Sequence, residues 1–342
     1  MRQATLGCGV TRQLVDDMTR MYSRRTSDAR FADAIIGCSG NKERAAINLV
    51  KAKRYAKELG CPVYMWQYHV DGAEPGESAG KEYIERLALL NPAQVGIFVP
   101  GAPTVLTENI AVQLAACNST RGRFAAMVFD DEDISAFVTR IIRDADAEPG
   151  EIVLLPLPPS ALLVHLDQLT AKQRGKLTAD LVTEYGPCET CVTVPLMRSQ
   201  SVIIGKTRLR RHGVELAFAC TIHKLQSLTM DKLVISLKRP TWTKTGGARA
   251  KWESVYVALT RVRLGCNLHI VPMSEADKDA LVGLVPRAAT MAIAHVYDDD
   301  GKFVASKVQE AYTKAQKVAA AAKKAHEHSL AKQRKRVTTL AM

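Results

Sequence analysis

Long hydrophobic runs are missing from this sequence. No uninterrupted apolar stretch reaches the ~18 residues of a transmembrane helix, and the first twenty residues have an early Arg2 but no apolar core after it, so we expect no secretory leader. The eight cysteines are mostly scattered singly, which is typical of free or buried thiols in a reducing compartment. We therefore expect an intracellular protein without a membrane segment, in the nucleus or mitochondrion of a eukaryote and otherwise in the cytoplasm.

The composition that is present belongs to a globular protein. The chain has 342 residues, of which 47% are hydrophobic and 24% charged, enough for one large or two ordinary domains, and no internal repeat is visible. The net charge of +12 is uneven: residues 305–342 carry nine Lys or Arg against Glu310 and Glu327, which leaves +5 for the other 304 residues. Such a basic tail attracts phosphate backbones without reading sequence, although a solubilising or nuclear-address segment is an equally good interpretation.

Hydrophobic periodicity predicts a mixed α/β chain. The predicted helices are 11–26, 42–59, 81–90, 171–184, 251–263 and about 305–336. The predicted strands are 62–70, 218–221, 232–237 and 266–272, together with short runs at 95–99, 104–107, 124–129, 151–157, 191–196 and 201–205. The short runs, separated by Gly and Pro, predict a small β-rich module inserted into an α/β domain.

Two ordered motifs are the strongest functional signal. The first is FACTIHKLQSLT at 218–229, and the second is VYVALTRVR at 255–263, followed by the apolar run NLHIVP. The chain here resembles PIF-type (petite integration frequency) superfamily-one DNA helicases, whose second motor domain carries T-I-H-K-x-Q-G-x-T and then Y-V-A-L-[ST]-R. Each motif alone has a high false-positive risk, but the ordered pair favours the functional interpretation.

The resemblance implies a role for each motif residue. Thr221, His223, Lys224 and Gln226 would face single-stranded DNA and couple it to the nucleotide cleft. Short hydroxyl and imidazole groups at a strand end suit a phosphate. Taken singly, a histidine after a strand is more often a satisfied core or loop residue.

The second motif would supply Arg261 to the nucleotide. This arginine matches the one that reaches the γ-phosphate in the family, where a guanidinium stabilises charge on the transferring oxygens. Tyr256 and Leu259 would form the buried face of the same helix. A lone arginine in an apolar helix is more often paired at a surface, so this assignment too depends on the ordered set.

Further segments extend the resemblance. Residues 41–48 (NKERAAIN) resemble T-N-x-x-V-x-x-I-N, with Gly40 where the threonine would stand. Residues 100–109 resemble K-x-G-A-x-V-M-L-x-x-N, and 118–122 resemble N-G-T-R-G with Ser119 in place of glycine. We interpret these elements as mainly architectural, with Arg121 either pairing locally or touching phosphate.

Two more residues are assigned to the nucleotide cleft by resemblance. The first three residues, MRQ, resemble the M-R-Q after the third helicase motif, which brings Arg2 to the cleft beside Arg261. Ser227 replaces the glycine that follows the motif glutamine, where glycine allows close backbone approach. This substitution weakens the expectation of a tight contact at that turn.

The resemblance predicts a RecA-like parallel-sheet domain with an inserted SH3-like β module and a C-terminal basic helix. Residues 1–34 would be the end of a first motor domain and a linker. Residues 35–95 and 206–285 would form the second motor domain, 96–205 the insertion, and 286–342 a connection and basic helical tail. The implied activity is ATP-driven 5′-to-3′ DNA unwinding in replication, repair, recombination or a Helitron-like mobile element.

The residues that grip ATP are not found in this sequence. A phosphate loop reads G-x-x-x-x-G-K-[ST], but Gly205-Lys206-Thr207 has Gln200 where the first glycine belongs. The run at 128–132 imitates a metal-binding strand end, and we interpret it as an acidic turn. We therefore expect ATP and Mg²⁺ to require a first motor domain from elsewhere. The alternative is a non-catalytic module that binds single-stranded DNA.

No metal site is predicted. The pair Cys188 and Cys191 forms a CxxC without a second pair at zinc spacing. His212 and Cys220 could be imagined as partners, but their spacing is not that of a zinc module.

Overall fold

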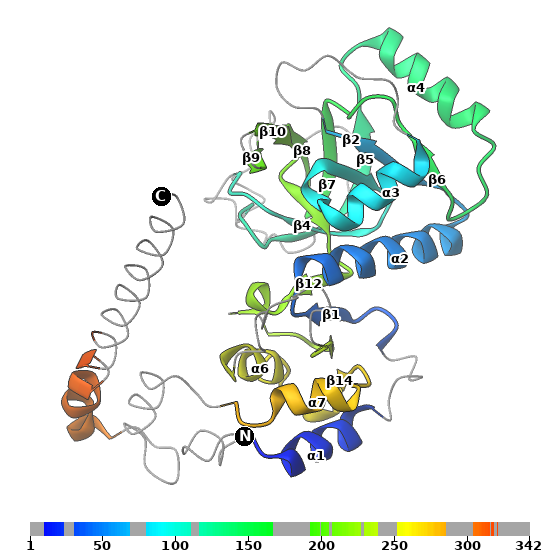
Figure 1. The fold of residues 1–342 in the computed structure, drawn as a ribbon. Helices are drawn as coiled ribbons and strands as arrows, with labels where there is room; N and C mark the ends of the chain where they lie inside the picture. Colours follow the sequence, from blue (N-terminus) through cyan, green and yellow to red (C-terminus); the bar gives the residue numbers. More distant parts are fainter. Residues whose placement is uncertain are drawn as a thin grey trace, which may run out of the picture. The chain divides into compact units, whose positions relative to one another are not determined.

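The chain folds into two compact units. The larger holds residues 28–236 and 262–267, and the smaller holds 1–27, 237–261 and 268–342. The computed structural model (Figure 1) describes residues 10–23, 31–68, 80–110, 116–166, 192–198, 200–204, 207–226, 229–238, 252–284, 304–314, 316–317 and 320. Several positions named above lie outside these residues, namely Arg2, Cys188, Cys191, Lys206, Ser227 and the predicted helix 171–184.

A parallel sheet carries the first motif in the larger unit. Strand β1 (Ile35–Cys38) pairs in parallel with β12 (Ala219–Thr221) on one side and with β13 (Leu233–Ile235) on the other. The chain between β1 and β12 spans most of the unit, so this sheet joins segments that are far apart in the sequence. The predicted mixed α/β fold with parallel strands is confirmed.

Helix α2 (Asn41–Leu59) follows β1 and packs against β12 and β1. Its sequence has no glycine or proline and buries Ala45, Leu49, Ala52 and Ala56 on one face, which suits a helix packed on a sheet. It ends where predicted, because Gly60 adopts a left-handed φ of 72° and its N–H bonds the carbonyl of Lys57.

A second, three-stranded sheet extends the larger unit. Strand β2 (Val63–Gln67) pairs antiparallel with β3 (Val95–Phe98) and parallel with β6 (Ile152–Leu154). Helix α3 (Lys81–Leu90) and the 3₁₀ turn η3 (Pro92–Gln94) connect β2 to β3. The predicted helix 81–90 is confirmed with the same bounds. Pro92 prevents its continuation at the C-terminal end.

The predicted β-rich texture becomes a five-stranded antiparallel sheet. Its order is β11 (Val214–Leu216), β4 (Pro103–Leu106), β5 (Arg121–Val128), β7 (Ala161–Leu166) and β8 (Val192–Met197). Strands β9 (Gln200–Ile204) and β10 (Thr207–Arg211) form a separate hairpin. At Gly122 a Cβ atom would lie 2.3 Å from the carbonyl oxygen of His165, so close packing of β5 on β7 requires glycine there.

The acidic run after β5 is more than a turn. It opens helix α4 (Glu132–Asp144), which was not predicted and lies at the edge of the larger unit in Figure 1. Exposed Asp131 is the N-cap, and its carboxylate accepts hydrogen bonds from the N–H groups of Asp133 and Ile134 at 2.8 and 3.1 Å. An acidic side chain at this position stabilises a helix start.

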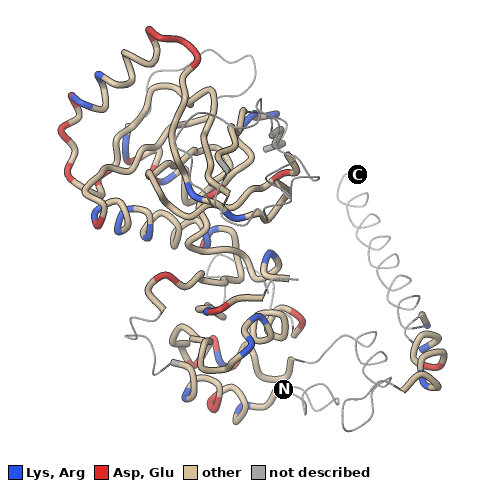
Figure 2. Tube along the Cα trace, turned by 180° about the vertical axis from the view of Figure 1, so that it is seen from behind, with Lys and Arg blue, Asp and Glu red and all other residues tan. Residues whose placement is uncertain are grey.

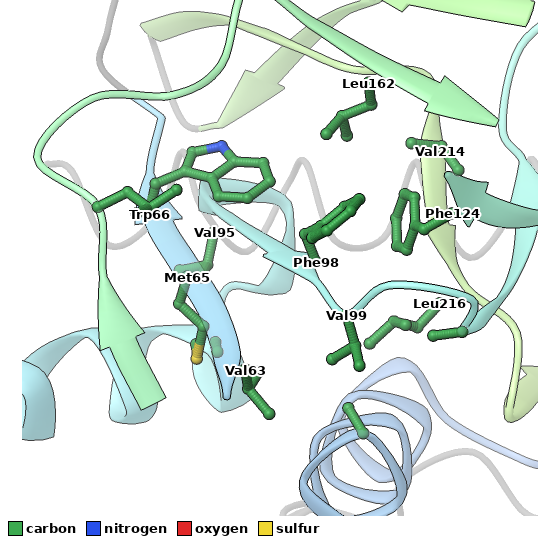
Figure 3. Close-up of a cluster of buried hydrophobic side chains, with 14 of the residues drawn as sticks. Val63, Met65, Trp66, Val95, Phe98, Val99, Phe124, Leu162, Val214 and Leu216 are labelled. Carbon is green, nitrogen blue, oxygen red and sulfur yellow. The ribbon is translucent and has the colours of Figure 1, made fainter. Parts of the chain in front are cut away.

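Aromatic side chains fill the core of the larger unit (Figure 3). Trp66 of β2, Phe98 of β3 and Phe124 of β5 are almost fully buried, and the rings of Phe98 and Phe124 lie 5.0 Å apart between centroids. Val99 and Leu216 lie beside them on the side of α2. This shared core ties the three-stranded sheet to the five-stranded sheet.

The smaller unit is built on helix α1 (Arg12–Ser23), which packs against β14 (Leu268–Ile270) and α7 (Glu275–Leu281). Arg12 forms ion pairs with Glu275 and Asp279 of α7. Nδ1 of the buried His269 lies 2.7 Å from the carbonyl oxygen of Tyr22. The unit also holds helix α6 (Trp252–Leu259) and the 3₁₀ turn η8 (Ala305–Lys307). The 3₁₀ turn η7 (Gly265–Asn267) belongs to the larger unit.

Ser119 stands in a backbone conformation that favours glycine. Its φ is 77°. Two hydrogen bonds hold the turn: the Ser119 N–H donates to the carbonyl of Leu106, and the side-chain oxygen of Asn109 accepts from the N–H of Asn118 at 2.9 Å. The related motif has glycine here, and the structure confirms that the position is a glycine-type turn. The left-handed region costs a non-glycine residue roughly 1–2 kcal/mol.

We expect Ser119→Gly to leave the free energy of unfolding unchanged or to raise it by about 0.5 kcal/mol, because relief of strain outweighs the extra freedom of glycine in the unfolded chain. Ser119→Val should lower it by at least ~1 kcal/mol, since a β-branched residue tolerates this φ poorly. Urea unfolding measures both. The control Ser135→Gly, inside helix α4, should be destabilising by about 0.5 kcal/mol, and the same loss at Ser119 would contradict the assignment.

Candidate functional site: the carboxyl edge of the parallel sheet

The first motif lies at the carboxyl edge of the parallel sheet. Cys38, the last residue of β1, pairs with Thr221, the last residue of β12, so both strands end side by side. After β1 the chain enters α2 at Asn41, and after β12 it enters the 3₁₀ turn η6 (Ile222–Leu225). The strand predicted here is confirmed, but the helix expected after it is a single 3₁₀ turn, because Gln226 is already extended with φ −57° and ψ 135°.

The 3₁₀ geometry sorts the motif side chains into two sets. Residues three apart lie on the same side of such a turn. Ile222 and Leu225 are buried beneath it, whereas His223 and Gln226 are exposed on its outer side. Thr221 is half-buried at the start of the turn, and its side chain caps no N–H group of η6. Of the four residues predicted to face DNA, His223 and Gln226 are therefore exposed at one sheet edge, and Thr221 and Lys224 are half-buried there.

Lys224 is held from inside the protein. Its ammonium lies 3.6 Å from a carboxylate oxygen of Glu215 on β11. The same carboxylate pairs with Arg44 of α2 and, at 3.2 Å, with Arg211 of β10. Burial alone would raise the pKa of Glu215, but the three cations outweigh it and bring the pKa to about 2. The carboxylate thus joins α2, β10, β11 and η6, a link that the motif itself did not reveal.

Asn48 also anchors the motif strand. The buried side chain donates to the carbonyls of Leu216 and Ala219 at 3.0 and 3.3 Å, and its oxygen accepts from the N–H of Ala219 at 2.7 Å. These bonds satisfy both amide groups of Asn48 and fix the start of β12 on α2. The final asparagine of the 41–48 element is the sequence signal for this role.

The cysteines near the site are unreactive. Cys38 is buried, and burial raises its pKa to about 12, while burial raises that of Cys220 to about 11. Both thiols are free and protonated at neutral pH. Within the described ranges, no group of three His, Cys, Asp or Glu side chains could hold a metal ion.

The second motif lies in the smaller unit. Helix α6 buries Trp252, Val255 and Ala258. The expectation that Tyr256 is buried was wrong, because the buried residues of the helix are spaced by three and Tyr256 is not one of them. Tyr256 is 41% exposed, and its ring stacks on that of Trp252 with 5.0 Å between the centroids. Leu259 is half-buried.

Arg261 follows the end of this helix. Its Nε donates to the carbonyl of Val257 at 2.9 Å and a terminal nitrogen donates to the hydroxyl of Thr260 at 2.9 Å, so the side chain folds back on its own helix. The placement of Arg261 beside Gln226 and Ser227 stays a prediction.

The described helices contain none that is both long and apolar enough to cross a membrane. No family model matches the chain, and no curated protein matches it in sequence.

Solved structures of Pif1 helicases are similar to this chain. The enzyme from Candida albicans shares 15% identity with a TM-score of 0.44, over 80% of this chain and 52% of that one. Bacteroides Pif1 bound to single-stranded DNA shares 16% identity with a TM-score of 0.42, over 85% and 51%. A structure of two coordinating Pif1 helicases at forked double-stranded DNA shares 16% identity with a TM-score of 0.46, over 85% and 49%. The chain is thus similar to Pif1 helicases over most of its own length and spans about half of theirs.

Proposed function

We propose that this chain is the second motor domain of an ATP-dependent, PIF-type 5′-to-3′ DNA helicase and that residues 221–226 bind a single-strand phosphate. The observation that carries the proposal is the placement of His223 and Gln226 on the open side of η6, next to Thr221. Hydroxyl, imidazole and amide groups donate to phosphate oxygens without reading the bases, as a translocating motor requires.

The start of α2 supports a phosphate at this edge. The first backbone bond of the helix runs from Arg44 N–H to the Gly40 carbonyl. The start of a helix attracts anions because the helix dipole is positive at that end. Because β1 and β12 end side by side, this helix start and Thr221 lie at the same edge.

The other parts of the proposal concern the rest of the chain. Residues 96–205 would be an SH3-like insertion, supported by the antiparallel strands β4, β5, β7 and β8. Residues 286–342 would be a connection and basic helix that adds non-specific attraction to DNA. ATP and Mg²⁺ would bind between this chain and a first motor domain that carries the phosphate loop, with Arg261 acting from this side and Arg2 and Ser227 bordering the cleft.

A second candidate function is a non-catalytic module that binds single-stranded DNA. The sequence favours it in one respect, because Gln200 replaces the first glycine of the sole GKT-containing segment. ATP turnover after a first motor domain is supplied separates the two functions.

Binding to single-stranded DNA tests the site. We expect the full chain to bind fluorescent oligothymidylate with strong salt dependence, and removal of 305–342 to flatten the salt slope while leaving residual binding. In that shortened chain, Thr221→Val combined with His223→Ala should weaken the residual binding by about tenfold or more, since hydrogen bonds to charged groups contribute roughly 1.5–3 kcal/mol each.

The matched control is Thr139→Val, whose hydroxyl bonds a carbonyl of its own helix α4 at 2.8 Å, away from the motif. It should leave the affinity unchanged. Complete loss of binding on removal of 305–342 would show that residues 221–226 contribute nothing, and the site would be wrong.

A further inference from the structure

A large groove lies at the edge of the parallel sheet opposite to the motif. Because β1, β12 and β13 run in parallel, the residues that precede them lie at the amino edge, and Ala34, Phe218 and Lys232 all line this groove. Its volume is about 610 Å³, within the ~300–1,000 Å³ typical of small-molecule sites. All of its lining residues belong to the larger unit.

Arg121 is the unusual residue of this groove. The half-buried side chain places a guanidinium nitrogen 3.1 Å from the sulfur of Met230, which is a weak and uncharged acceptor. Burial lowers the pKa of Arg121. No carboxylate among the described residues forms an ion pair with it. A desolvated cation without a counter-charge is costly, and an anion bound in the groove would supply that charge.

Other cations surround Arg121. Arg123 lies two residues along β5 and therefore on the same side of the strand. Lys232 stands before β13, and Lys51 and Arg54 come from α2, along which Lys and Arg recur in Figure 2.

Three carboxylates also line the groove. They belong to Asp33, Glu58 and Asp231, against five Lys and Arg, so the groove has a net charge of +2. The carboxylate of Glu58 is already held by Arg54 at 2.8 Å. Apart from this pair, four cations (Lys51, Arg121, Arg123 and Lys232) and two carboxylates (Asp33 and Asp231) line the groove.

Two aromatic rings complete the wall. Tyr55 and Phe218 are half-buried with ring centroids 5.6 Å apart, and the Tyr55 hydroxyl donates to the carbonyl of Gly101 at 2.9 Å. This bond fixes the Tyr55 ring on the groove wall. Aromatic faces beside cations are the usual means of holding a base and its phosphate without regard to sequence.

We propose that this amino-edge groove binds the phosphate of a nucleotide, free or within a single strand, with Arg121 on the phosphate and the Tyr55–Phe218 pair beside the base. The groove lies on the other edge of the sheet from residues 221–226. It therefore stands or fails independently of the function proposed for those residues.

The test compares Arg121→Gln with the parent in the full chain, using labelled oligothymidylate and a labelled adenine nucleotide. We expect the variant to bind at least one of the two probes about tenfold more weakly than the parent, because the charged hydrogen bonds to phosphate are lost. Loss confined to the oligonucleotide identifies a strand site, and loss of both identifies a nucleotide site. The matched control Arg143→Gln, exposed on α4, should bind both probes like the parent.

Photo-crosslinking locates the ligand directly. An oligonucleotide carrying 5-iodouracil should attach to Tyr55 or Phe218, and the adduct should persist when Thr221→Val and His223→Ala remove the motif donors. Arg121→Lys keeps the positive charge and should retain part of the affinity. Partial affinity in Arg121→Lys would show that the loss in Arg121→Gln follows the charge and not unfolding. Unchanged affinity of Arg121→Gln for both probes, with adducts confined to 221–226 or 305–342, would overturn the proposal.

Discussion

Replacement of Glu215 by Gln is expected to lower the free energy of unfolding by roughly 3–5 kcal/mol, the usual cost of removing one partner from a buried ion pair. The carboxylate is the shared partner of Arg44, Arg211 and Lys224. Gln keeps the shape of the side chain but removes the negative charge that the three cations share. The loss affects Arg44 most, because only 9% of its side chain is accessible to solvent and water cannot replace the carboxylate.

The same network predicts a pH dependence with a definite sign. The folded-state pKa of Glu215 is about 2, below its ordinary value of 4.5, so the stabilisation is complete above pH 4.5 and is lost as the pH falls toward 2. The total is roughly 3 kcal/mol. Burial lowers the pKa of His212 to about 4, which destabilises the fold below pH 6.5 in the parent and the variant alike. The difference between the two chains therefore isolates Glu215.

Urea unfolding at pH 7, 4.5 and 3 measures both effects. Glu58→Gln is the matched control, because its ion pair with Arg54 is largely exposed and such pairs contribute at most about 1 kcal/mol. Glu215→Gln should also weaken binding of single-stranded DNA, since Lys224 of η6 loses its anchor. If the free energy of unfolding of Glu215→Gln lies within 1 kcal/mol of the parent value at pH 7, the charge of Glu215 does not stabilise the three cations.

Local signals were enough to predict many elements. Helix α2 was predicted because its apolar residues recur at helical spacing and Gly60 ends it, and the prediction of α3 at 81–90 also agrees with the structure. Strand β7 was not recognised, because its apolar run follows the prolines of 156–159 and has no alternation to distinguish it. Helix α4 was missed because its acidic start at Asp131 was interpreted as a turn, although an N-cap carries the same residues.

The candidate site was predictable only in part. The motif predicted the sheet edge and the accessible His223 and Gln226. It could not reveal that Lys224 is tied to Glu215, because the strand that bears Glu215 belongs to another sheet. The Asn48 anchor and the groove around Arg121 likewise depend on segments brought together by the fold.

A loss of ATP turnover of ~10³-fold is expected for Arg261→Ala once a first motor domain is supplied, typical of the loss of an arginine that acts on the transferring phosphate. The guanidinium is held through Nε by the Val257 carbonyl at 2.9 Å. In the proposed motor its positive charge stabilises the negative charge that grows on the phosphate oxygens in the transition state. Binding of ATP before the reaction should change far less than turnover.

The measurement is DNA-stimulated phosphate release by this chain joined to a first motor domain that carries the phosphate loop. The chain by itself should release no phosphate above background. Arg261→Lys should not restore the rate, because a lysine lacks the planar fork of donors, and Arg263→Ala, exposed two residues further on, serves as the control. Equal melting temperatures would show that the fold is intact. Parent-like turnover in Arg261→Ala would mean that Arg261 has a structural role and that the second motif does not contribute to ATP hydrolysis.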